Sequence, residues 1–178
     1  VMRKLEVPPF ASYLRAEQLS QGETFYPLHA RVCDRCYLVQ LEQFESPEAI
    51  FGEYAYFSSY SESWLRHARE YAERMVERFH LGKDSLVVEV ASNDGYLLQH
   101  FLPLGVPVVG IEPAANVADV ARRKNIPTLV EFFGLGLAQK LVSEGKSADL
   151  IIGNNVLAQV PNLNDFAAGM AHLLAPHG

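Results

Sequence analysis

The sequence predicts an α/β protein in which a partial, doubly wound parallel sheet carries helices on both faces, preceded by a small hairpin module and one long helix. Two observations carry this prediction. From Leu86 onward, short apolar runs alternate with amphipathic segments that have helical spacing. Before that point, two short apolar stretches flank the only two cysteines, Cys33 and Cys36, which have two residues between them.

The composition of the 178-residue chain narrows the class of protein. Hydrophobic residues make up 49% and charged residues 20%, which is typical of a soluble globular protein. The net charge of −6, without a stripe of Lys and Arg, argues against a nucleic-acid partner. We see neither an apolar run long enough to span a bilayer nor a signal-peptide pattern, so we expect a cytoplasmic protein with no membrane partner.

The first part of the chain predicts little regular structure outside a hairpin. Residues 1–22 read as irregular, with Pro8, Pro9 and Gly22 as breakers. Residues 25–32 and 37–41 partly alternate in polarity, which predicts a hairpin with Cys33 and Cys36 at its tip. This cysteine spacing is typical of metal or redox sites and forms half of a structural zinc site.

An aromatic segment and a long helix follow the hairpin. The aromatic segment covers residues 54–60. After it, apolar residues recur at helical spacing and charged residues fill the other face, which predicts an amphipathic helix over residues 63–80. The second half then predicts a parallel sheet with right-handed crossovers. Its strands are expected at 86–91, 106–112, 128–132 and 148–153, and its helices at 95–102, 114–124, 135–144 and 163–174.

Polar, acidic and aromatic residues gather where the predicted strands end. Ligands of doubly wound sheets bind at the carboxyl ends of the strands. The small-residue turn 91–95 would let backbone amides and a helix N-terminus approach a carboxylate or phosphate. Glu112 follows this turn by about 20 residues, the distance expected of an acid that binds ribose hydroxyls. Phe132 and Phe133 offer an apolar face for a base, and Asn154 and Asn155 end the last strand.

The turn itself argues against a dinucleotide. Ala91 and Asn93 stand where the GxGxxG pattern needs glycines, and Asp94 would repel a pyrophosphate. A ligand with a cationic centre and an amino group tolerates carboxylates better, and S-adenosylmethionine has both.

Several motifs together carry a resemblance to a known family. They are EVASNDGYLLQHF, GIEPAANVADVA, VEFFG and GNNVLAQVPNLNDF, with CDRCYLVQLEQF and YAYFSSYSESWLRHA upstream. In this order they resemble class I S-adenosylmethionine-dependent methyltransferases, and more narrowly the C-methyltransferases of nucleotide-linked 4-keto deoxysugars. The resemblance covers nearly all of the chain and implies a Rossmann-like methyltransferase core. It implies a partial zinc-binding module at 1–53, an aromatic lid and linking helix at 54–85, and the N-terminal half of the cofactor domain at 86–178, truncated at both ends.

The resemblance also implies roles for individual residues. It places the methionine part of the cofactor near Ala91, Asn93 and Gly95, with Glu89 and Asp94 in the same binding set. It places the ribose on Glu112 beside Pro113, and the adenine by Phe132 and Phe133. Asn154 and Asn155 would line the floor, and a lid would be formed by Tyr56, Phe57, Ser58 and Ser59.

The reaction implied by the resemblance is methylation of the carbon next to a ketone through an enolate. The general base is expected beyond Gly178, so the chain alone is expected to be inactive, and Tyr60, His67 and His100 are only weak candidates. Gln159 stands where the family is expected to carry a histidine. A first cysteine pair is expected before residue 1, so the longer protein would bind zinc and this chain would hold half the site at Cys33 and Cys36.

The partial sheet has a further implied consequence. Four of the usual seven strands would be present, in the order 3-2-1-4, which leaves residues 148–153 as an apolar edge. A bare edge invites pairing with another chain, so we expect self-association through this strand. Three rival interpretations stay open: a methyltransferase of another small molecule, a nicotinamide-binding oxidoreductase domain, and a non-catalytic zinc-ribbon module with a degenerate Rossmann-like domain.

Overall fold

A computed structural model describes residues 5–8 and 13–178. The chain divides into two compact units, Val1–Ala55 and Tyr56–Gly178. Within the part of the chain that is described, no helix is both long enough and apolar enough to cross a membrane.

The described residues of the first unit form two small antiparallel sheets and one short α-helix. The predicted hairpin is confirmed, with Cys33 and Cys36 between its strands. The irregular segment expected at 1–22 is wrong in part, because it contains a strand and a 3-10 helix at Ala16–Gln18; residues 1–4 and 9–12 lie outside the described residues. The strands are β1 (Leu5–Val7) paired with β2 (Tyr26–Leu28), and β3 (Arg31–Val32) paired with β4 (Val39–Gln40); the helix is α1 (Pro47–Phe51).

The cysteine hairpin is shorter than its polarity pattern predicts. Residues 26–28 pair with β1 and not with β4, so the long first strand expected at 25–32 is divided in two. The loop is closed where the Cys33 amide donates to the Leu38 carbonyl, 3.0 Å away, and the Tyr37 amide donates to the Cys33 carbonyl at 3.0 Å. Tyr37 adopts a positive φ of 61° there, which takes it out of the extended conformation expected of a strand.

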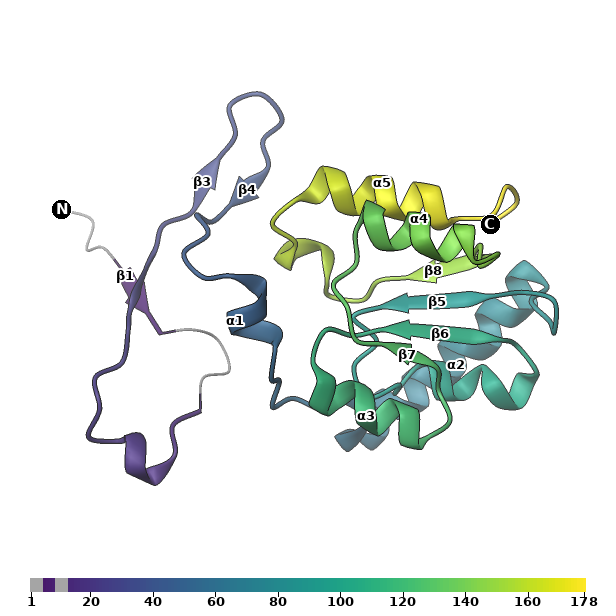
Figure 1. Cartoon of the computed structure of the whole chain (residues 1–178), viewed down its shortest axis with the longest axis horizontal. Helices are drawn as coiled ribbons and strands as arrows, with labels where there is room; N and C mark the ends of the chain where they lie inside the picture. The colour runs from purple at the N-terminus through teal and green to yellow at the C-terminus, as the bar shows by residue number, and fades with distance from the viewer. Residues whose placement is uncertain (1–4, 9–12) are drawn as a thin grey trace. The chain divides into compact units, whose positions relative to one another are not determined.

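The second unit is built on a four-stranded parallel sheet with the order β7-β6-β5-β8 (Figure 1). This is the predicted order. Helices α4 and α5 lie on one side of the sheet, and α2 and α3 lie on the other (Figure 1). The strands are β5 (Val87–Val90), β6 (Val108–Ile111), β7 (Thr128–Leu129) and β8 (Leu150–Ile152); the helices are α2 (Glu62–Phe79), α3 (Ala115–Arg123), α4 (Leu135–Ser143) and α5 (Leu163–Leu173).

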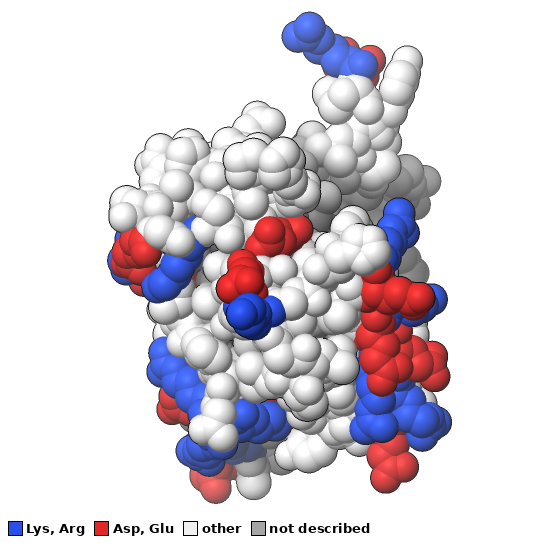
Figure 2. Space-filling view, turned by 90° about the vertical axis from the view of Figure 1, so that its right-hand side faces the viewer, with Lys and Arg blue, Asp and Glu red and all other residues white. Residues whose placement is uncertain are grey.

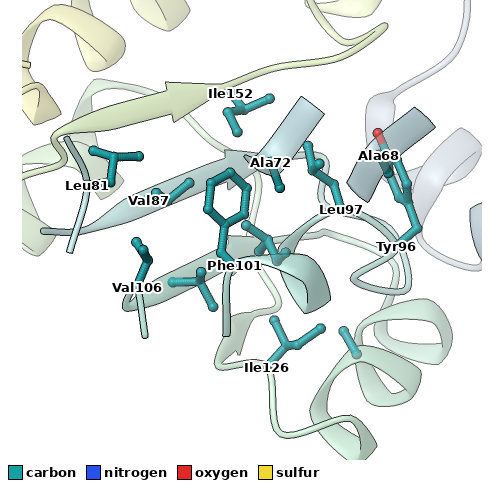
Figure 3. Close-up of a cluster of buried hydrophobic side chains, with 13 residues drawn as sticks. Ala68, Ala72, Leu81, Val87, Tyr96, Leu97, Phe101, Val106, Ile126 and Ile152 are labelled. Carbon is teal, nitrogen blue, oxygen red and sulfur yellow. The ribbon is translucent and has the colours of Figure 1, made fainter. Parts of the chain in front are cut away.

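The core follows the alternation of side chains along each strand. Val87 on β5 packs into the cluster that includes Ala68 and Ala72 of α2, where Phe101 and Ile126 also lie (Figure 3). Val88 and its neighbours on the opposite face pack against α4 and α5. Since both faces are covered by helices, the short strands are apolar runs, as expected for a parallel sheet.

Glu89 is the exception on the α2 face of β5. Its partners in register are Gly110 on β6 and Ile152 on β8. A Cβ atom at Gly110 would lie 2.5 Å from the Ser92 hydroxyl, so the missing side chain leaves room for polar groups at this end of the sheet. This placement puts a carboxylate inside an otherwise apolar layer.

The helix expected at 95–102 is not an α-helix. The chain continues in turns after β5 and forms only two short 3-10 helices, Leu98–His100 and Leu102–Leu104. Gly95 has a positive φ of 74°, so an α-helix cannot begin there, and Pro103 has no N–H to donate, so a regular helix cannot continue past residue 102 either. The dipole of a long helix is therefore missing at the turn.

Helices α4 and α5 approach each other closely through glycine. A Cβ atom at Gly169 on α5 would lie 2.8 Å from the backbone carbon of Gly134. Next to this contact, the Leu135 amide at the start of α4 donates to Asp165 Oδ2 of α5 at 3.3 Å. The Phe133 and Phe166 rings meet edge to face, with centroids 5.3 Å apart. These contacts fix the segment between β7 and α4 on the helical layer.

The outer edge of β8 begins to be covered at its start. Ala148 forms a parallel bridge with Leu174, and the Ala175 amide donates to the Ala148 carbonyl at 2.8 Å. Self-association through residues 148–153 stays a prediction.

On the face seen in Figure 2, Lys and Arg side chains lie beside Asp and Glu side chains and form no continuous basic patch.

Gly95 is held by both its backbone conformation and its packing. Its φ is +74°, and an added Cβ would lie 2.3 Å from Ile126 Cδ1. We expect Gly95→Ala to lower the free energy of unfolding by about 2–4 kcal/mol, from backbone strain together with overpacking. Urea unfolding followed by circular dichroism measures the change.

Gly105→Ala is the matched control for this substitution. Gly105 has nearly the same φ, +72°, but nothing lies within 4 Å of an added Cβ. It should therefore show only the backbone strain, about 1 kcal/mol. Equal losses in the two variants would mean that the contact with Ile126 does not constrain the turn.

Candidate functional site

The turn after β5 has a backbone that few residues adopt. Ala91, Asn93 and Gly95 all have positive φ, at 58°, 51° and 74°. Non-glycine residues in this region are uncommon, and they concentrate at functional sites where surrounding structure holds them. The side chains of Ser92, Asn93 and Asp94 are buried. A strained and buried polar turn at the carboxyl end of a central strand is the expected place for a ligand.

Glu112 at the end of β6 holds this turn from the side. Its Oε2 accepts a hydrogen bond from the Asn93 amide at 3.0 Å, and its Oε1 accepts one from the Ala114 amide at 2.9 Å. Burial raises the pKa of Glu112, and these two amide hydrogen bonds oppose the rise. Each oxygen keeps a free lone pair, so the carboxylate can accept from two further donors.

Glu89 is the least satisfied group of the site. It is 0% exposed, and neither carboxylate oxygen has a hydrogen-bond partner among the described residues. Burial raises its pKa well above the ordinary value, and the charges of Glu112 and Asp94 add to the rise. The Tyr96 hydroxyl opposes it but lies outside good hydrogen-bonding geometry. A buried, unpartnered carboxylate beside two other acids creates a strong preference for a cationic ligand.

Tyr96 links three elements around these acids. Its ring stacks on Trp64 of α2, with centroids 5.8 Å apart, and its hydroxyl accepts a hydrogen bond from Asn154 Nδ2 at 3.2 Å. Burial and the charge of Glu89 raise the pKa of Tyr96, so the phenol stays protonated. The sequence pattern does not indicate a role in the site for Tyr96 or Trp64, because their neighbours come from distant parts of the chain.

The aromatic segment lies directly against the turn. The Ser58 amide donates to Asn93 Oδ1 at 2.8 Å, Asn93 Nδ2 donates to the Tyr56 carbonyl at 3.1 Å, and the Ser59 amide donates to Asp94 Oδ2 at 3.2 Å. The Asn93 side-chain amide and Asp94 Oδ2 thus bond to residues 56–59, while Asp94 Oδ1 is buried without a partner among the described residues. This places the predicted lid residues beside the predicted cofactor turn.

The two phenylalanines expected at the adenine differ in their surroundings. Phe133 is partly buried and packs on Phe166. Phe132 is 42% exposed, and so it is the one whose ring is accessible to a ligand. Both follow β7, which ends at Leu129 and not at Phe132 as predicted.

The remaining predicted residues lie at the expected strand ends. Pro113 follows Glu112 and is half-buried, and Asn155 follows Asn154 with a φ of 54°. The Asn155 carbonyl accepts from Gln159 Nε2 at 2.8 Å, so that glutamine stabilises its own turn. Of the weak base candidates, Tyr60 is 86% exposed and the His67 ring stacks on Trp64. His100 Nε2 is buried without a partner, and burial lowers the pKa of its imidazole.

Cys33 and Cys36 have a local geometry that suits a metal. Backbone hydrogen bonds from Cys36 and Arg35 lower the pKa of the Cys33 thiol, which favours the thiolate that binds zinc. Both cysteines are free. In the described ranges 5–8 and 13–178, no group of three or more His, Cys, Asp or Glu residues is placed to hold a metal. These residues therefore fit half of a four-ligand site.

Comparison with known families assigns the second unit. A family model described as "Methyltransferase domain" matches residues 88–178, just over half of the chain. The chain belongs to the methyltransferase family. A second model, described as "Putative zinc binding domain", matches residues 6–51 of this methyltransferase.

Two curated relatives of this methyltransferase are similar to it over different lengths. The C-methyltransferase NovU of Streptomyces niveus is 34% identical over 171 residues, which is 96% of this chain and 41% of the relative. The ubiquinone biosynthesis O-methyltransferase of Bartonella tribocorum is 27% identical over 93 residues, 52% of this chain and 38% of the relative. The methyltransferase chain thus spans about two fifths of the length of these relatives.

A solved structure supports the Rossmann-like α/β fold of this methyltransferase. The crystal structure of Streptomyces venezuelae DesVI aligns with a TM-score of 0.51 and 17% sequence identity, covering 66% of this chain and 49% of DesVI. At this identity the likeness concerns the fold alone.

Proposed function

We propose that the second unit binds S-adenosylmethionine and serves a C-methyltransferase that acts on a nucleotide-linked keto-deoxysugar. One observation supports the cofactor: the buried Glu89 carboxylate has no hydrogen-bond partner among the residues that the structure describes, and it lies close to two other buried acids, Asp94 and Glu112. S-adenosylmethionine brings a sulfonium and an ammonium group, which together compensate this negative charge. A pyrophosphate would instead add charge of the same sign.

The cofactor supplies an activated methyl group, and the chain supplies its binding and orientation. Glu112 would accept hydrogen bonds from the ribose hydroxyls through its free lone pairs, while it keeps the turn amides in place. Phe132 would cover the adenine, and the methionine part would lie at the turn after β5. Fixing one reactant in this way is the contribution that positioning makes to a two-substrate reaction.

The acceptor chemistry is the one implied by the resemblance to sugar C-methyltransferases, and the relative named a C-methyltransferase supports transfer to carbon. A base removes the proton from the carbon next to a ketone, the resulting enolate forms the new carbon–carbon bond with the methyl group, and the sulfur keeps the electron pair of the broken bond. Neither Tyr60 nor His67 is held as a base needs to be, since one is exposed and the other stacks on Trp64. The second candidate is a methyltransferase of another small molecule, favoured by the weaker likeness to an O-methyltransferase.

Zinc takes no part in the proposed methyl transfer. Cys33 and Cys36 would supply two thiolates to a structural site, and two further ligands would complete it in a longer protein. A zinc ion bound there would contribute to folding of the first unit and not to methyl transfer.

The cofactor is tested by calorimetric titration of the chain with S-adenosylhomocysteine and, in parallel, with NAD. We expect saturable binding of S-adenosylhomocysteine and no heat of binding from NAD, because the buried acids disfavour a pyrophosphate. Saturable NAD binding alone would make the domain a nicotinamide-binding one. A second arm offers labelled S-adenosylmethionine with a nucleotide-linked 4-keto sugar. Label transferred to another small molecule but not to the sugar would favour the second candidate.

A further inference from the structure

Residues 56–60, here called the lid segment, are tied to the turn after β5 by side chains of that turn. Three hydrogen bonds join them, from the Ser58 and Ser59 amides and to the Tyr56 carbonyl. All three use Asn93 or Asp94, which lie 35 to 37 residues further along the chain. Such contacts hold the lid segment only while the two acceptor side chains keep their orientation.

Lys124 makes a second connection between the same two elements. Its ammonium donates to the Ser59 hydroxyl at 2.8 Å and to the Asp94 carbonyl at 2.8 Å, and it lies 3.7 Å from Asp94 Oδ2. The side chain is 29% exposed, whereas that of Asp94 is only 2% exposed. One cation therefore contacts an oxygen of the lid segment and two oxygens of the turn.

The position of Lys124 is set by the fold. It caps the C-terminal end of α3, and its backbone amide donates to the Ala121 carbonyl. Lysine at this end of a helix agrees with the helix dipole. The structure adds a contact across 65 residues that the dipole does not require.

We propose that Lys124 is a positioning residue that anchors the lid segment to the turn and thereby sets the affinity for the cofactor. This inference rests on the proposed function for its cofactor part. Without the ammonium, Asp94 loses its nearest cation and the Ser59 hydroxyl loses its donor. Both effects loosen the lid segment, so cofactor binding must then order it again.

The test compares Lys124→Met with Lys124→Arg and with Lys140→Met as control. Lys140 lies at the surface in an ion pair with Glu131, and its side chain is 57% exposed. Two signals are measured: S-adenosylhomocysteine affinity, and the rate of chymotrypsin cleavage after Tyr56 and Phe57. We expect about tenfold weaker binding and faster cleavage in Lys124→Met, partial recovery in Lys124→Arg, and wild-type behaviour in Lys140→Met.

Ser59→Ala separates the anchoring role from a general effect on folding. A double variant combines Ser59→Ala with Lys124→Met. If Lys124 acts through Ser59, this double variant should lose no more affinity than Lys124→Met alone, because both substitutions remove the same contact. Independent, multiplicative losses would overturn the proposal, as would wild-type binding and cleavage in Lys124→Met. Should the unsubstituted chain not bind S-adenosylhomocysteine, the proposed function fails, and the cleavage rates still decide whether Lys124 anchors the lid segment.

The single tryptophan gives a third signal. Trp64 follows the lid segment at the start of α2 and stacks on Tyr96. Its fluorescence should change on cofactor binding at the same ligand concentrations as the calorimetric signal, and the midpoint should move in Lys124→Met. A midpoint that does not move would count against coupling between Lys124 and the site.

Discussion

Replacing Glu112 by alanine should weaken the binding of S-adenosylhomocysteine about 100-fold, which corresponds to two lost hydrogen bonds to a charged group. The loss has two sources. The ribose hydroxyls lose their acceptor, and the Asn93 and Ala114 amides lose theirs, so the turn is no longer fixed. Calorimetric titration measures the affinity, and circular dichroism confirms that the variant is folded.

A conservative substitution and a control at another acid accompany this variant. Glu112→Gln keeps the size of the side chain and one carbonyl oxygen, and about a tenfold loss is expected of it. Glu131→Ala removes an exposed acid that pairs with Lys140 near the end of β7, and it should bind as the unsubstituted chain does. Unchanged affinity in Glu112→Ala would mean that the ribose does not lie at the end of β6.

Glu89→Gln should move stability and cofactor binding in opposite directions. At pH 8 we expect the free energy of unfolding of the variant to be about 1–3 kcal/mol higher, because a buried carboxylate without a partner among the described residues is removed. We also expect 10- to 100-fold weaker binding of S-adenosylhomocysteine, since its ammonium group loses the counter-charge. Glu77→Gln, on the exposed surface of α2, is the control and should change neither quantity.

The effect of Glu89 on the free energy of unfolding should depend on pH in one direction. The pKa of Glu89 is raised in the folded chain, while its unfolded value is about 4.3. Between those two values the folded state binds more protons, so this group makes stability fall as pH rises. Below pH ~4 both states are protonated and the contribution is absent. Urea unfolding at several pH values should therefore show the advantage of Glu89→Gln growing from acid to alkaline pH; a variant less stable at pH 8 would reveal a protein partner for Glu89.

The parts of the structure that follow a local pattern could be predicted from the sequence. The strands of the parallel sheet, the long amphipathic helix and the cysteine hairpin came from periodicity and spacing, and the order of the strands came from the family resemblance; the structure confirms them. Glu112 could be chosen because its distance from the turn reflects one strand–helix–strand unit. The helix expected at 95–102 was wrong because the tight turn after β5 holds Gly95 at a positive φ, and the apolar pattern does not reveal this backbone conformation.

The parts that depend on contacts between distant residues could not be predicted in this way. Lys124 touches Ser59 across 65 residues, and Asn154 reaches Tyr96 across 58. No spacing rule relates such pairs, because their distance is set by the packing of whole elements. The sequence equally could not separate Phe132 from Phe133, which are adjacent and chemically the same, although only Phe133 packs on Phe166.

The close glycine contact between α4 and α5 has a consequence for how a ligand enters and leaves. It makes the side of the site formed by Phe133 and the start of α4 rigid, because two backbones cannot approach further and are pinned by Asp165. The lid segment, by contrast, is joined to the turn after β5 by hydrogen bonds from side chains. Exchange of ligand should therefore take place through the lid side, and the dissociation rate should report on those hydrogen bonds. Substitutions along the α4–α5 contact should change how well the protein folds far more than how fast it releases its ligand.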